Sequence, residues 1–167
     1  AEAVGIDGIE KIIKEKSLIK AYKDGKDKEA RWNMMMASTE GAMAFSKGLG
    51  AVHSMSHATG ANQELRLHHG TLNAVILPAV LEFNQNHVGN KYSRIARAMG
   101  KNDSINLANE IRKLNENIGI PSGLAEMGVT EDMIPELVTH SITDPSNLTT
   151  PRLPNEEEWE KLFLESM

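Results

Sequence analysis

The sequence contains no cysteine, which excludes both a disulfide framework and a metal site built on thiolates. Any metal ion must therefore be bound by histidine, carboxylate or water ligands. A chain without disulfides is typical of the cytosol, so we expect a cytoplasmic protein. No signal-peptide pattern opens the chain, and the first residue, Ala1, is compatible either with a removed initiator methionine or with a longer polypeptide.

Long apolar runs and clusters of positive charge are also missing. The longest uninterrupted apolar run, Ala74 to Leu81, is far shorter than the roughly 20 residues that a membrane helix needs. The net charge is -5 and no basic stripe is visible, so we expect neither a membrane span nor a nucleic-acid surface. The balance of 40% apolar and 25% charged residues is that of a soluble globular protein.

Helical periodicity dominates the whole chain. A length of 167 residues suits one domain with a continuous core, so we expect a single domain over residues 1–167. No segment shows convincing strand alternation, which predicts an all-α fold, a bundle of about seven to nine helices. The clearest predicted helices cover residues 5–23, 27–47, 69–83, 92–99, 107–118 and 156–165.

Prolines affect the expected structure of two segments. The helix predicted over residues 69–83 is apolar almost all round, which indicates burial on every side. Pro78 lies inside this helix and removes one of its backbone hydrogen bonds. Three prolines lie between Thr143 and Asn155, and we expect an extended surface segment there.

Four of the six histidines lie within seventeen positions: His53, His57, His68 and His69. His53 and His57 stand four apart, so a helix places both imidazoles on one side, one turn apart. His68 and His69 open the next predicted helix, and a helix-loop-helix arrangement would bring His69 close to His53. Metal binding is therefore the first function to test, although histidines a turn apart are also compatible with an ordinary helix face or with buried hydrogen bonds.

No other segment supplies an obvious metal or nucleotide site. Ser54 stands where the H-E-x-x-H motif of metalloproteases has its general-base glutamate, which excludes that class. The segment Gly48–His53 lacks the last glycine of a dinucleotide fingerprint and follows a predicted helix, so we expect no nucleotide-binding turn. Glu136 and His140 are expected on a solvated helix face. Because a catalytic metal site needs at least three protein ligands, two histidines leave it incomplete.

The histidine segment carries a resemblance to a known family. Three motifs occur in order: GLGAVHSMSH over Gly48–His57, then His69-Gly70, then NAVILP over Asn73–Pro78. Together they resemble the signature of the iron-containing (group III) alcohol dehydrogenases. Members of that family have an N-terminal α/β domain that binds NAD or NADP and a C-terminal helical domain that supplies the metal. This chain resembles the second half only.

The resemblance implies roles for three histidines. Family members bind one divalent ion, usually iron or zinc, through an aspartate and a histidine four apart on an early helix and through two later histidines. By motif, the later metal ligands are His53 and His69, and the Asp-x-x-x-His pair would precede Ala1. His57 matches a further active-site histidine near the nicotinamide and is the candidate catalytic residue, either relaying a proton or positioning the substrate. His68 is expected at the surface or beside the site.

The implied function is the helical metal-binding half of an NAD(P)-dependent alcohol dehydrogenase or aldehyde reductase. The metal would act as a Lewis acid on the oxygen of a small alcohol, and hydride would pass to the nicotinamide held by the other domain. The full-length protein would be a homo-oligomer, and this chain alone would be inactive. The alternative is a stand-alone helical module that binds a metal or another protein without catalysis. A third interpretation gives the histidines a purely structural role.

Overall fold

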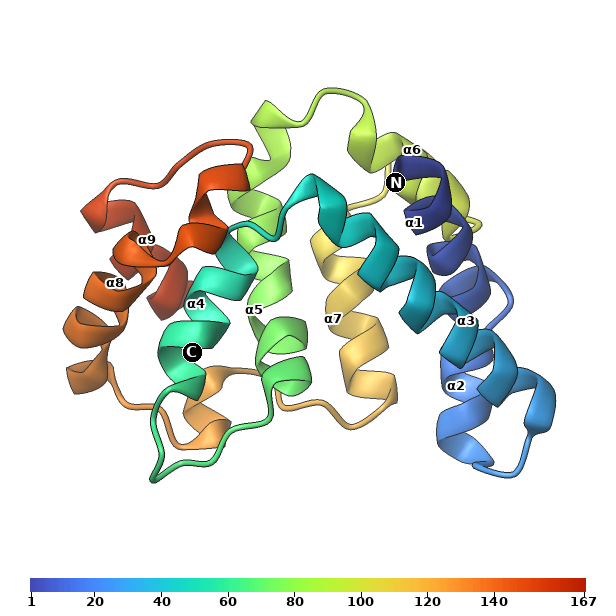
Figure 1. Ribbon diagram of the computed structural model, residues 1–167, viewed down its shortest axis with the longest axis horizontal. Coiled ribbons are helices and arrows are strands. Elements are labelled where there is room, and N and C mark those ends of the chain that lie inside the picture. Colours follow the sequence, from blue (N-terminus) through green and yellow to red (C-terminus); the bar gives the residue numbers. More distant parts are fainter. The chain divides into compact units, whose positions relative to one another are not determined.

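The computed structural model describes residues 1–167 and contains nine α-helices and no strands. The prediction of an all-α fold with seven to nine helices is therefore confirmed. The helices are α1 (Glu2–Ile9), α2 (Ser17–Lys23), α3 (Lys28–Ala44), α4 (Ala51–Gly60), α5 (His69–Asn84), α6 (Lys91–Ala98), α7 (Leu107–Asn117), α8 (Ile134–Thr143) and α9 (Glu156–Glu165) (Figure 1). None of them is both long enough and apolar enough to cross a membrane.

The chain divides into two compact units. The first comprises residues 1–48 and 89–105, and the second comprises residues 49–88 and 106–167. In the first unit, α1 and α2 pack against α3, and α6 packs against α1. In the second unit, α4 packs against α5 and α8, while α9 packs against α8 and α5. All four histidines of the histidine-rich segment, His53, His57, His68 and His69, belong to the second unit.

The helix predicted over residues 5–23 is wrong as a single element. A π-helical turn follows α1, and Lys16 then adopts a left-handed conformation with φ of 60° before α2 begins. The amide of Asn33, on α3, donates to the Ser17 hydroxyl and to the Glu15 carboxylate, each at 3.2 Å. Contacts with α3 therefore stabilise the break at Lys16, which the hydrophobic periodicity of the sequence does not indicate.

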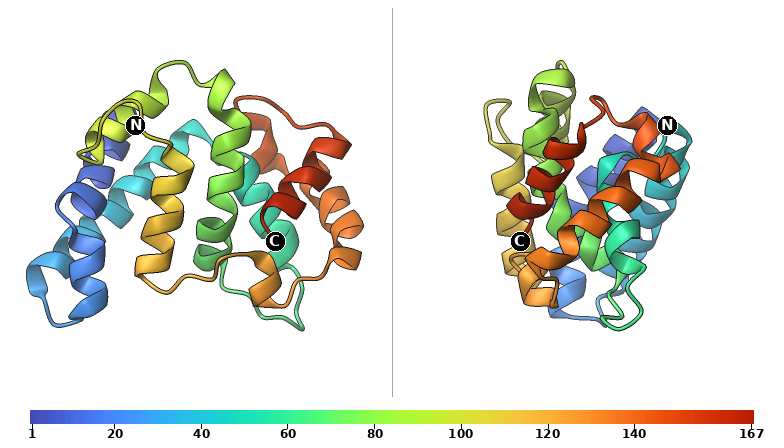
Figure 2. Two further views of the ribbon diagram at one scale, coloured as in Figure 1. Left: turned by 180° about the vertical axis from the view of Figure 1, so that it is seen from behind. Right: turned by 90° about the vertical axis from the view of Figure 1, so that its left-hand side faces the viewer.

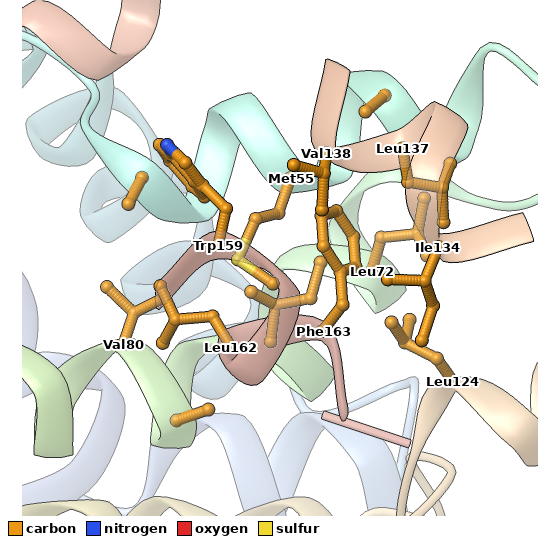
Figure 3. Close-up of a cluster of buried hydrophobic side chains, with 14 of the residues drawn as sticks. Met55, Leu72, Val80, Leu124, Ile134, Leu137, Val138, Trp159, Leu162 and Phe163 are labelled. Atoms are coloured by element: carbon orange, nitrogen blue, oxygen red, sulfur yellow. The ribbon is translucent and has the colours of Figure 1, made fainter. Parts of the chain in front are cut away.

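The core of the second unit is formed where four helices meet. Side chains from α4, α5, α8 and α9 converge in Figure 3, among them Met55, Leu72, Val138, Trp159 and Phe163, all of them buried. Burying large apolar side chains is the main favourable term in folding. This shared core fixes α4 against α5, and these are the helices that carry the histidine motif.

Helix α5 runs continuously through Pro78. A proline cannot donate to the carbonyl four residues earlier, which here belongs to Ala74. The side-chain amide of Asn115, on α7, donates to that carbonyl at 2.7 Å. Figure 2 shows α7 beside α5 along much of its length. The neighbouring helix thus supplies the hydrogen bond that the proline removes.

The segment after α8 is more ordered than the extended stretch we predicted. A 3-10 helix covers Pro145–Thr149, and the Asp144 carboxylate caps it by accepting from the backbone N–H of Ser146 at 2.8 Å. The amide of Asn147 donates to two carbonyls at the end of α8, at 2.8 and 2.9 Å. The N–H of Gly50, which has φ of +87°, donates to the Ser146 carbonyl at 2.8 Å. This segment is therefore tied directly to the start of α4.

Candidate functional site

Three of the predicted histidines lie together in the second unit. His53 and His57 project from α4, and His69 is the first residue of α5. The ring centroid of His69 lies 5.2 Å from that of His53 and 5.3 Å from that of His57, and the His53 and His57 centroids are 5.7 Å apart. The structure thus brings the two predicted ligands and the predicted catalytic histidine to one place.

The hydrogen bonds around His69 favour one tautomer of its imidazole. The hydroxyl of Ser56 donates to the carbonyl of His53 at 3.2 Å, so it accepts from Nδ1–H of His69 at 3.3 Å. The other ring nitrogen, Nε2, is then a lone-pair acceptor, and the amide of Asn73 donates to it at 3.1 Å. A lone-pair imidazole nitrogen is the atom that binds a transition metal. His69 is therefore held in a tautomer suited to metal binding.

The surroundings of the cluster lower the pKa values of two of its imidazoles and so favour their neutral form. Burial lowers the pKa of His53, and the neighbouring imidazoles lower it further. Burial also lowers the pKa of His69, with further lowering by His57 and His68. Neutral imidazole is the form that binds a metal ion, because a protonated ring has no lone pair to donate.

The donor set fits part of a site for a divalent transition metal. Imidazole nitrogens are ordinary ligands of zinc and iron, and the side-chain oxygen of Asn73, next to His69, is buried without a hydrogen-bond partner. No group of three or more histidine, aspartate or glutamate side chains is placed to hold a metal ion. His53 and His69 could therefore supply only two of the three or more protein ligands that such a site needs.

An aspartate that the sequence analysis missed completes the cluster. The Asp144 carboxylate lies 3.0 Å from Nδ1 of His57, and its side chain is only 17% exposed. Burial alone would raise the pKa of Asp144, but hydrogen bonds from Ser146 and His57 outweigh that effect and hold the pKa below its ordinary value. Asp144 lies 87 residues from His57, so no helical spacing in the sequence links the two residues. Only its position before Pro145, as the cap of a turn, is visible in the sequence.

The remaining histidines lie outside this cluster of rings. His68 caps α5, and its Nδ1 accepts from the backbone N–H of Thr71 at 3.3 Å. His140 is exposed on α8, 4.0 Å from the exposed Glu136, which agrees with the predicted solvated face. His87 lies in a short 3-10 helix after α5. The two adjacent histidines therefore have different roles: His68 caps α5, and His69 lies in the cluster with His53 and His57.

The chain is all-helical, and its adjoining helices α4 and α5 present three histidines beside Asp144. Residues 2–167 match the sequence profile described as the Fe-containing alcohol dehydrogenase family, C-terminal. The chain belongs to this family and corresponds to the C-terminal part of its members. The resemblance stated from the histidine motifs is confirmed.

Relatives and solved structures agree with this assignment. The chain is 39% identical over 174 residues to a 4-hydroxybutyrate dehydrogenase of Cupriavidus necator, covering 100% of this chain and 45% of the relative. It is 34% identical over 171 residues to a 1,3-propanediol dehydrogenase of Citrobacter freundii, covering 97% and 43%. The crystal structure of a 1,3-propanediol oxidoreductase superposes with a TM-score of 0.91 at 32% identity, covering 99% and 44%. The chain therefore spans less than half the length of these proteins.

Proposed function

We propose that this chain is the metal-binding half of an NAD(P)-dependent, divalent-metal-dependent alcohol dehydrogenase or aldehyde reductase that acts on small alcohols or aldehydes. The observation that carries the proposal is the geometry of His53 and His69, whose ring centroids lie 5.2 Å apart and whose pKa values are lowered chiefly by burial, in a chain of this family. We assign both as metal ligands. The remaining ligands, an aspartate and a histidine by family resemblance, belong to polypeptide outside residues 1–167.

The residues of this chain have separate tasks in the proposed reaction. His53 and His69 hold the ion, and the Ser56 hydroxyl keeps the metal-binding nitrogen of His69 unprotonated. When bound, Fe²⁺ or Zn²⁺ supplies a Lewis acid that polarises the substrate oxygen. His57 moves the proton that leaves the alcohol or enters the aldehyde. The NAD or NADP is bound mainly by the other half of the full-length protein.

We place the full-length protein in the cytoplasm as a homo-oligomer whose partners are small substrates. The lack of cysteine and the net charge of -5 support a cytoplasmic protein that contacts neither nucleic acid nor membrane. The family resemblance supports the oligomer. Gel filtration of the full-length protein with light scattering measures its state, and a monomer at micromolar concentration would contradict this assignment.

The test of the function uses the full-length gene product. We expect it, after loading with Fe²⁺ or Zn²⁺, to oxidise NADH or NADPH in the presence of short aldehydes, and to lose this activity on treatment with a chelator. His53→Ala should abolish the activity, because it removes a ligand. His140→Ala is the matched control, since it removes an exposed histidine from α8. Inactivity with every aldehyde, metal and coenzyme tested would contradict the proposal.

A further inference from the structure

We propose that Asp144 is a positioning residue that fixes the tautomer and orientation of His57. Its carboxylate accepts a hydrogen bond from Nδ1–H of the imidazole, so that Nε2 is the lone-pair nitrogen that His57 presents for proton transfer. The catalytic consequence rests on the proposed function, whereas the tautomer is a property of the residues themselves and is measured without turnover.

The first support is the geometry of the pair. Oδ2 of Asp144 lies 3.0 Å from Nδ1 of His57, while Oδ1 accepts from the backbone N–H of Ser146 at 2.8 Å. An ionised carboxylate has no proton to donate, so the shared proton in the 3.0 Å contact belongs to Nδ1. A neutral imidazole carries one proton, which leaves Nε2 as the acceptor nitrogen.

The second support is that independent contacts fix the carboxylate in place. Asp144 lies between the end of α8 and the 3-10 helix that it caps, and the side chain of Asn147 bonds back to two carbonyls of α8. The N–H of Gly50, which precedes α4, donates to the carbonyl of Ser146. The residues that place Asp144 are therefore attached to the helix that carries His57. A group held in this way loses little conformational freedom when it forms its hydrogen bond.

The third support is the orientation of the ring that Asp144 contacts. The imidazole of His57 stacks on that of His69, with an angle of 19° between the ring planes and centroids 5.3 Å apart. Stacking restricts the tilt of the ring, and the bond to Asp144 selects which nitrogen faces the carboxylate. Both restraints are needed, because stacking alone allows the ring to turn over and exchange Nδ1 for its opposite edge.

The decisive variant is Asp144→Asn in the full-length protein. The amide oxygen still caps the turn at Ser146, whereas the amide nitrogen now faces His57 and donates. We therefore expect the tautomer to reverse, with the proton on Nε2 of His57. Asp144→Ser is the second variant, because serine also caps a helix start but is too short to reach the ring; we expect a mixture of tautomers. Glu136→Gln, beside the exposed His140, is the matched control and should leave His57 unchanged.

The tautomer is read from long-range ¹H–¹⁵N spectra of protein labelled with ¹⁵N-histidine, with His57→Gln identifying the signals. An Nε2 proton on His57 in the unaltered protein, or an unchanged tautomer in Asp144→Asn, would overturn the proposal. In the kinetic arm, Asp144→Asn should lower kcat by about tenfold or more while KM changes by less than about threefold. A reversed tautomer with unchanged kcat would overturn the catalytic part. An inactive starting protein would refute the proposed function, and the spectra would still decide the tautomer.

Discussion

At the scale of single residues, the site depends on hydrogen bonds that decide where protons reside. The Ser56 hydroxyl is committed to the His53 carbonyl and can therefore only accept from His69. Because Ser56 stabilises the metal-binding tautomer of His69, we expect its loss to lower the metal affinity, though by less than loss of His69 itself.

Ser56→Ala tests this arrangement. Without the hydroxyl, Nδ1 of His69 has no acceptor at this position, and the tautomer with an unprotonated Nε2 loses its preference. We expect the full-length protein to bind its metal about tenfold more weakly, measured by competition with a chelator of known affinity. Ser54→Ala, on the same helix and equally buried, is the control because its hydroxyl contacts a backbone carbonyl and not a histidine. Equal affinities of the two variants would contradict the assignment.

Acid should destabilise the metal-free protein through His53 and His69. The pKa values of His53 and His69 lie below the ordinary value of 6.5, chiefly because of burial. Just below pH 6.5 the unfolded chain therefore binds more protons at these residues than the folded chain does, so the free energy of unfolding decreases as the pH falls. Denaturant titrations between about pH 7.5 and 5.5 measure this slope. A double variant, His53→Gln with His69→Gln, should show a shallower slope, and an unchanged slope would refute the interpretation.

At the scale of elements, the sequence predicted a helix correctly where nearby residues, such as a cap, set its boundary. The predicted helix at 156–165 matches α9, because Asn155 and Glu158 form a capping box that fixes where the helix starts. The helix predicted over residues 5–23 failed because Lys16, a residue with no special preference for positive φ, takes that conformation under contacts from α3. Periodicity describes which face is apolar and gives no information on such tertiary contacts.

The proline in α5 provides an element-scale prediction. Asn115→Ala should lower the free energy of unfolding by about 1 to 2 kcal/mol, because the Ala74 carbonyl loses the donor that replaces the N–H absent from Pro78. In a Pro78→Ala background the helix regains its own donor, so the same change should cost much less. Denaturant unfolding of the four proteins forms a double-mutant cycle. An equal cost of Asn115→Ala in both backgrounds would show that the two groups are not coupled.

At the scale of the whole molecule, the sequence predicted the residues that share one motif and missed the residue that only the fold brings near. His53, His57 and His69 lie within seventeen positions, so helical geometry and one loop were enough to place them together. Asp144 reaches the site from the far end of α8, 87 residues after His57. No periodic pattern links residues so far apart, because their proximity depends on how α4 packs against α8 and the turn that follows it.

The partial ligand set has a consequence for the isolated chain. Its residues present no group of three histidine, aspartate or glutamate side chains that could hold an ion, whereas stable sites of this kind use at least three protein ligands. We expect residues 1–167 alone to bind Zn²⁺ at least about tenfold more weakly than the full-length protein and to show no dehydrogenase activity. Isothermal titration with Zn²⁺ compares the two proteins, and equal affinities would contradict the division of the site.

The most direct test of the account is the metal content of the purified full-length protein, measured by inductively coupled plasma mass spectrometry. We predict about one iron or zinc ion per chain in the unaltered protein. His53→Ala and His69→Ala should each lose most of it, while His140→Ala, which removes an exposed histidine, retains it. Full metal content in both ligand variants, with their folding confirmed by circular dichroism, would contradict the central claim that these two imidazoles hold the ion.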